Sequence, residues 1–185
     1  MPLFAWILIA VVVLVVGWYI ATYNKLITAK NATQNSWSDI DVQLKRRYDL
    51  IPNVVETVKG YAGHEKSLLT KVTEARAAAM SAKTPAEHAK AENMLTETLK
   101  SLFAVAENYP DLKASQNFLG LQSELRDAED KIQAARRFYN ANVRDFNTML
   151  QVFPTNMVAS FMGFTAREFF EVAAEAQREA PAVKF

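Results

Sequence analysis

The amino-acid sequence predicts an all-α membrane protein, with an N-terminal transmembrane helix followed by an antiparallel helical bundle with long helices. The first 22 of the 185 residues carry no charged side chain. Beyond them, alanine is abundant, glycine is rare, and no long alternating run of β-branched residues occurs. Apolar residues there recur at steps of three and four, the spacing of one helix face. We divide the chain into an anchor (1–24), a bundle (25–178) and a tail (179–185).

The anchor is the run MPLFAWILIAVVVLVVGWYIAT. At ~1.5 Å of rise per residue, it is long enough to cross the ~30 Å hydrocarbon layer of a bilayer. Aromatic side chains favour the membrane interface, and several stand near the ends of the run: Trp6, Trp18, Tyr19 and Tyr23. A cleaved signal peptide is the alternative. It normally has a basic start and a small-residue cleavage site, and this run has neither feature, so we expect a retained single-pass anchor.

The cations beside the anchor predict its orientation. Lys25 and Lys30 follow the apolar run, and no Lys or Arg precedes it. Because cytoplasmic flanks carry the excess of Lys and Arg, we expect the helical domain to face the cytoplasm. A domain on the periplasmic or extracellular side is the alternative.

The first bundle helix carries one apolar stripe. Its members follow one another in steps of three or four residues: Trp37, Ile40, Leu44, Tyr48, Ile51, Val55, Val58 and Ala62. Pro52 lies within the stripe, and because the phase continues past it, we expect a kink and not a stop. Gly60 and Gly63 then precede a second helix containing Leu68 to Ala79.

Two helix starts and one long helix follow. Thr84-Pro85-Ala86-Glu87 has the residues of a capping box and predicts a helix that runs to about Glu107. A stripe from Leu112 through Ser115, Leu119 and Leu125 to Leu150 predicts one helix approaching 40 residues, which ends before Pro154. Thr165-Ala166-Arg167-Glu168 predicts a short final helix.

The sequence gives no support to catalysis, a cofactor or a metal site. The 21 Lys and Arg nearly balance the 20 Asp and Glu, so we expect no nucleic-acid partner. Cysteine is absent. His64-Glu65 lacks the second histidine of a zinc-protease helix, and His88 belongs to another predicted helix. We therefore predict a protein that is not an enzyme.

Two segments are candidates for interaction. In the run from Trp37 to Glu65, the cations Lys45, Arg46 and Arg47 could belong to a solvated face, pack within the chain, or meet a partner. For a face of this kind, we expect that reversing both arginines to Glu leaves thermal unfolding nearly unchanged. The uncharged segment 152–164 either caps the end of the bundle or contacts a membrane or partner. Its candidate residues are Phe153, Phe161 and Phe164.

Several separated motifs resemble the LemA family of bacterial membrane proteins. They are SDIDVQLKRRYDLIPNVVETVKGYAGHE, ENYPDLKASQNF, RRFYNANVRDFN, FPTNMVA and the GF at 163–164, in the family's order. The resemblance covers residues ~23 to 175 and implies an N-terminal span, an antiparallel bundle and a place in the bacterial inner membrane. It brings no settled reaction and no catalytic residues. We therefore expect a noncatalytic, membrane-anchored protein that interacts with the lipid bilayer and with itself or another membrane protein. The alternative is a sensor or adaptor that binds a peptide or small ligand through the bundle.

Overall fold

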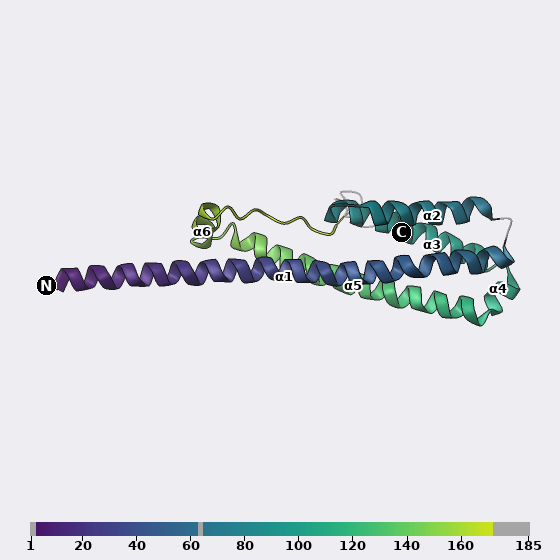
Figure 1. Ribbon diagram of the computed structural model, residues 1–185, viewed down its shortest axis with the longest axis horizontal. Helices are drawn as coiled ribbons and strands as arrows, with labels where there is room; N and C mark the ends of the chain where they lie inside the picture. Colours follow the sequence, from purple (N-terminus) through teal and green to yellow (C-terminus); the bar gives the residue numbers. More distant parts are fainter. Residues whose placement is uncertain (1–2, 63–64, 172–185) are drawn as a thin grey trace, which may run out of the picture. The chain divides into compact units, whose positions relative to one another are not determined.

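The computed structural model describes residues 3–62 and 65–171. Its helices are α1 (Leu3–Tyr61), α2 (Lys66–Ser81), α3 (Pro85–Ala106), α4 (Pro110–Ala114), α5 (Gln116–Met149) and α6 (Thr155–Phe161), shown in Figure 1. The described ranges contain no strand. The all-α prediction with a long N-terminal apolar helix and packed bundle helices is thus confirmed. The described residues form two compact units: those of 3–38 and 138–167 (unit 1), and those of 39–137 and 168–171 (unit 2).

Unit 1 contains the N-terminal part of α1, the end of α5, and α6. Within the described ranges, α1 is the one helix long and apolar enough to cross a membrane. From Leu3 to Ile20 its large apolar side chains other than Tyr19 are exposed, as expected of a surface that faces lipid. The anchor predicted at 1–24 has no helical break at its end, because α1 continues to Tyr61.

A small core closes unit 1. Leu26 of α1, Phe146 of α5, and Val158 and Ala159 of α6 are buried together. Tyr19, Tyr23, Ala29, Met149, Leu150 and Phe164 pack around them. α6 therefore lies against α1 where the uncharged run gives way to Lys25.

Unit 2 is a helical bundle whose core follows the predicted stripe. α1 contributes the buried residues Ile40, Leu44, Tyr48, Ile51, Val54 and Val58, and Ala62 is buried just after its end. The predicted stripe differs at one position, because it included Val55, which is only partly buried, in place of Val54. α2 and α3, which lie side by side in Figure 1, bury mainly Ala and Leu, so that their backbones can approach closely. The α5 part of the core consists of Phe118, Leu125, Ala128 and Ile132.

The proline inside α1 does not stop the helix, as predicted. Pro52 has no backbone N–H, so the carbonyl of Tyr48, four residues earlier, lacks its helical donor. Arg76 of α2 supplies the donor, because its Nε donates to this carbonyl oxygen at 2.7 Å. A neighbouring helix thus replaces the hydrogen bond that the proline removes.

The capping box at the start of α3 is confirmed. The Glu87 N–H donates to Thr84 Oγ1 at 3.2 Å, and the Thr84 N–H donates to Glu87 Oε2 at 3.2 Å. Pro85 occupies the first turn, where a missing N–H has no cost. The helix ends at Ala106, one residue before the predicted end.

The prediction of a single helix from Leu112 to Leu150 is wrong at its beginning. Ser115 has an extended backbone (φ −67°, ψ 121°) that separates α4 from α5. Its hydroxyl accepts from the Phe118 N–H at 3.5 Å, as a cap of the new helix does. The break changes the phase of the stripe, so Phe118 is buried and Leu119, a predicted stripe member, is 42% exposed.

The short helix predicted to start at Thr165 is also wrong over residues 165–171, the part of it that the structure describes. Residues 164–171 have no helical structure. The Asn147 side chain holds the backbone of Arg167 on both sides, accepting from its N–H at 2.8 Å and donating to its carbonyl oxygen at 2.9 Å. These bonds satisfy the backbone groups that a helix would use. The end of the predicted bundle and the tail at 179–185 lie outside the described residues.

Candidate functional site

The three predicted cations of α1 have different environments in unit 2. Lys45 is exposed. Arg46 is about half-buried and pairs with two acids of α5, Asp127 at 2.7 Å and Glu124 at 3.6 Å. Hydrogen bonds from Lys131 and, next, from Arg46 lower the pKa of the Asp127 carboxyl. Lys45 and Arg46 therefore remain on the surface of the bundle.

Arg47 is buried, with only 3% of its side chain exposed. Its Nη1 lies 3.0 Å from Glu92 Oε2, and its Nη2 donates to Thr96 Oγ1 at 2.8 Å, both on α3. The same Nη1 is 2.8 Å from Glu129 Oε2 of α5, an ion pair without an aligned N–H. Of the three roles considered for these cations (a solvated face, packing within the chain, or contact with a partner), Arg47 has the second. Reversing it to Glu would place a third carboxylate in this cluster, so for Arg47 we replace the expectation of nearly unchanged unfolding by one of lower thermal stability.

Tyr48 completes this buried ionic cluster. Its hydroxyl donates a short hydrogen bond to Glu92 Oε1, so both carboxylate oxygens of Glu92 are bonded. Burial raises the pKa of Glu92, opposed by the Tyr48 hydrogen bond and the Arg47 charge. Burial, reinforced by Glu92, also raises the pKa of Tyr48. Both carboxylate oxygens of Glu92 thus have partners on α1, as in an ion pair that joins helices, whereas Glu129 Oε2 has no aligned donor.

A groove lies beside this cluster in unit 2. Its volume is about 400 Å³, and apolar side chains from α3 and α5, including Leu99, Phe103 and Leu125, line much of it. This is the size of a small-ligand site. The sequence indicated α3 and α5 as core helices but gave no sign of a groove between them.

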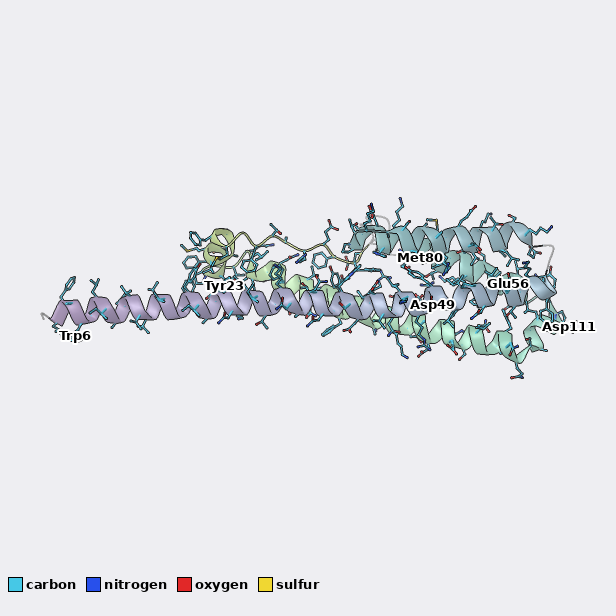
Figure 2. All side chains as sticks on the ribbon, in the orientation of Figure 1. Trp6, Tyr23, Asp49, Glu56, Met80 and Asp111 are labelled. Carbon is cyan, nitrogen blue, oxygen red and sulfur yellow. The ribbon has the colours of Figure 1, made fainter. Side chains whose placement is uncertain are left out.

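The predicted phenylalanines of 152–164 divide into two kinds. Phe153 and Phe161 are 74% and 82% exposed. Phe164 is half-buried, with its ring centroid 6.2 Å from that of Tyr23 and 6.3 Å from that of Phe146. Figure 2 shows Tyr23 on α1 beside α6. The segment thus both caps the core of unit 1 and presents apolar side chains outward.

The described residues contain no group of three or more His, Cys, Asp or Glu placed to hold a metal. His88 is half-buried on α3, and burial lowers the pKa of its imidazole. The other histidine considered, His64, lies outside the described residues.

Comparison with known proteins agrees with this architecture. The model of the LemA family matches residues 36–185. Protein LemA of Metamycoplasma hominis is 32% identical over 145 residues, which are 76% of this chain and 65% of the relative, so the chain spans about two thirds of that protein's length. Magnetosome protein MamQ 2 of Paramagnetospirillum magneticum is 25% identical over 89% of this chain and 71% of the relative. Magnetosome protein MamQ of Magnetospirillum gryphiswaldense is 23% identical over 80% and 64%. From the motifs, the helical bundle and the extent of the family match, the chain belongs to the LemA family.

Proposed function

We propose that the protein is a noncatalytic, membrane-anchored helical module that acts by assembling with itself or with another membrane protein. The observation that carries this proposal is that the charged cluster is buried between helices while large apolar side chains are exposed. The buried ionic cluster of Arg47, Tyr48, Glu92 and Glu129 connects α1 with α3 and α5. Large apolar side chains, in contrast, lie exposed along the N-terminal part of α1 and around α6. Exposed apolar surface of this extent is typical of association with lipid or protein.

The outer face of α1 in unit 2 is the surface that we assign to assembly. Val42 is 63% exposed, and Lys45 and Asp49, one and two turns further on, are also exposed. An interface combines apolar contact with a charged rim, and Val42 with Lys45 and Asp49 offers both on one face of α1. A second copy would bring its own Lys45 and Asp49, so a two-fold arrangement can pair opposite charges.

Single cysteines test this assignment directly, because the chain has none of its own. Val42→Cys and Lys45→Cys in the full chain, reconstituted in bilayers, are oxidised and the covalent dimer is measured. The matched controls are Asn93→Cys and Glu97→Cys, exposed positions on α3. We expect dimers at the α1 positions, at least fivefold above the controls. Equal yields at all four positions would remove self-assembly through this face. In that case, a photo-crosslinker placed at position 45 in cells tests assembly with another protein. The proposal fails if the crosslinker attaches no single defined membrane protein.

A second candidate function is a sensor or adaptor, and the apolar groove lined by Leu99, Phe103 and Leu125 favours it. Such a groove suits an apolar small ligand or side chain. Ala104→Trp would fill it from one wall. If the groove binds ligands, the wild-type chain should enhance the fluorescence of anilinonaphthalene sulfonate and the tryptophan variant should not, at equal thermal stability. Equal fluorescence would exclude the groove as the binding site.

A further inference from the structure

The α6 segment, residues 152–164 of unit 1, packs against α1 close to the end of the uncharged run. Val158 and Ala159 are buried against Leu26, and Tyr19 packs on the same core. The twenty residues from Leu3 to Thr22 span ~30 Å at ~1.5 Å each, which is the thickness of the hydrocarbon layer. If these residues lie in the bilayer, its boundary falls among the residues that hold α6.

The outward side of this segment is apolar. Phe153, Met157 and Phe161 are 74%, 62% and 82% exposed, and Val152 and Met162 add to the same surface. Residues 152–164 carry no charge. Met157 and Phe161 are four residues apart and share one side of α6, whereas Val158 and Ala159 face the core. α6 thus has a buried face toward α1 and a second apolar face for which unit 1 provides no cover.

Unit 1 has an excess of cations, and two of them lie next to the apolar segment. Unit 1 contains Lys25, Lys30, Arg144 and Arg167 against a single acid, Asp145. A cavity of about 270 Å³ is lined by both Lys30 and Arg167. The Asn147 amide fixes the backbone of Arg167, and Lys30 Nζ lies 6.0 Å from the centroid of the Phe164 ring. Two cations therefore share one hollow next to the apolar segment.

The depth of this cavity suits a lipid headgroup. Lys30 is eight residues beyond Thr22, or ~12 Å along the helix axis. Helical side chains lean toward the N-terminus, so the Lys30 stem reaches back toward the bilayer by several ångströms. Its charge then falls close to the headgroup layer, which is ~5–8 Å deep on each side of the hydrocarbon. An anionic headgroup is the ligand that two cations at this level attract.

We propose that unit 1 binds an anionic phospholipid of its own bilayer. Phe153, Met157 and Phe161 enter the acyl region, and Lys30 with Arg167 holds the phosphate of the headgroup. Tyr19, which belongs to the long apolar part of α1, packs on the core that holds α6, and this proximity favours lipid as the occupant of the apolar surface. The inference is independent of whether the protein assembles through α1.

The insertion is tested by Phe161→Cys, labelled with an environment-sensitive fluorophore in the full chain in nanodiscs. Glu97→Cys on α3 of unit 2 is the control, since it is exposed and polar. We expect the label at 161 to shift to the blue and to be quenched by spin-labelled acyl chains at least threefold more than the control. Equal quenching, or disulfide dimers through unlabelled Phe161→Cys, would overturn lipid as the occupant.

The headgroup site is tested by native mass spectrometry of the full chain in micelles titrated with dioctanoyl phosphatidylglycerol or dioctanoyl phosphatidylcholine. We expect phosphatidylglycerol to bind at least tenfold more tightly, and Lys30→Gln with Arg167→Gln to abolish this preference. Arg144→Gln, an exposed cation of the same unit that does not line the cavity, should keep it. Equal effects of the two changes, or displacement of the lipid by 10 mM inorganic phosphate, would overturn the assignment.

Discussion

Replacing Arg47 by Leu should destabilise unit 2 through the carboxylate that it leaves behind. Glu92 is only 2% exposed, and without Arg47 it would keep the Tyr48 hydroxyl as its donor. Glu129 is 29% exposed and can regain water, so most of the cost comes from Glu92. Breaking a buried pair in this way costs about 3–5 kcal/mol. For a chain of this size each kcal/mol lowers Tm by about 2–4 °C, so we expect a fall of roughly 6–20 °C.

The pH dependence of this loss has a definite sign. Burial already raises the pKa of Glu92, and Arg47 is one of the groups that oppose the rise. In the Leu variant the pKa of folded Glu92 should be higher still, so the folded state holds a proton that the unfolded state has released. Stability then increases as the pH falls through the raised pKa, by up to about 1.4 kcal/mol per pH unit. The variant should therefore recover part of its loss between pH 7 and pH 5.

Thermal and urea unfolding of the full chain in micelles, followed by circular dichroism at pH 7, 6 and 5, measures both effects. Arg46→Leu is the matched control, because its partly exposed pairs contribute about 0–1 kcal/mol. Adding Glu92→Leu to Arg47→Leu should restore much of the stability, since the buried charge is then gone. The reasoning is refuted if Arg47→Leu unfolds within about 1 kcal/mol of the wild type, or if its loss grows on acidification.

Three further predictions concern other parts of the chain. Arg76→Ala should cost about 1.5–3 kcal/mol by leaving the Tyr48 carbonyl without a donor. Pro52→Ala should reduce that cost, because alanine restores the helical N–H donor to the same carbonyl. A double-mutant cycle of Arg76→Ala and Pro52→Ala, measured by urea unfolding, that shows no coupling would contradict the Arg76–Tyr48 contact. Thr84→Ala should cost about 1 kcal/mol in the same assay through loss of the α3 cap, and an unchanged midpoint would argue against the capping box. A C-terminal fluorescent reporter that matures only in the cytoplasm should be active, and activity of a reporter restricted to the outside would reverse the predicted topology.

The features predicted from sequence are those determined by neighbouring residues. The apolar run of the anchor, the stripe of α1 and the Thr84 capping box depend on residues within a few turns of one another. The break at Ser115 is local as well, but a serine within a continuing apolar stripe gives no clear sign of an extended backbone. Its effect on the burial of Phe118 and Leu119 follows from a single dihedral angle.

The contacts of the candidate sites depend on residues far apart in the chain. Arg47 and Glu92 are 45 residues apart, and Arg76 and Tyr48 are 28 apart. No periodicity relates such positions, so a buried arginine and a surface arginine look alike in the sequence. The same is true of Arg167, which Asn147 holds from 20 residues away. The sequence therefore located the charged and apolar segments but not the partners of their residues.

The density of charge around Lys45 has a physical explanation in the contacts of one turn of α1. Arg46 pairs with α5, Arg47 with α3 and α5, and the Tyr48 carbonyl accepts from Arg76 of α2. An apolar stripe alone fixes the register of a helix weakly, because sliding it by one turn replaces one aliphatic side chain by another. Here the same shift would bury Arg47 and Glu92 without their partners, at a cost of several kcal/mol. We therefore expect this turn to favour a single register among the helices of unit 2, although each of its exposed pairs contributes little to stability.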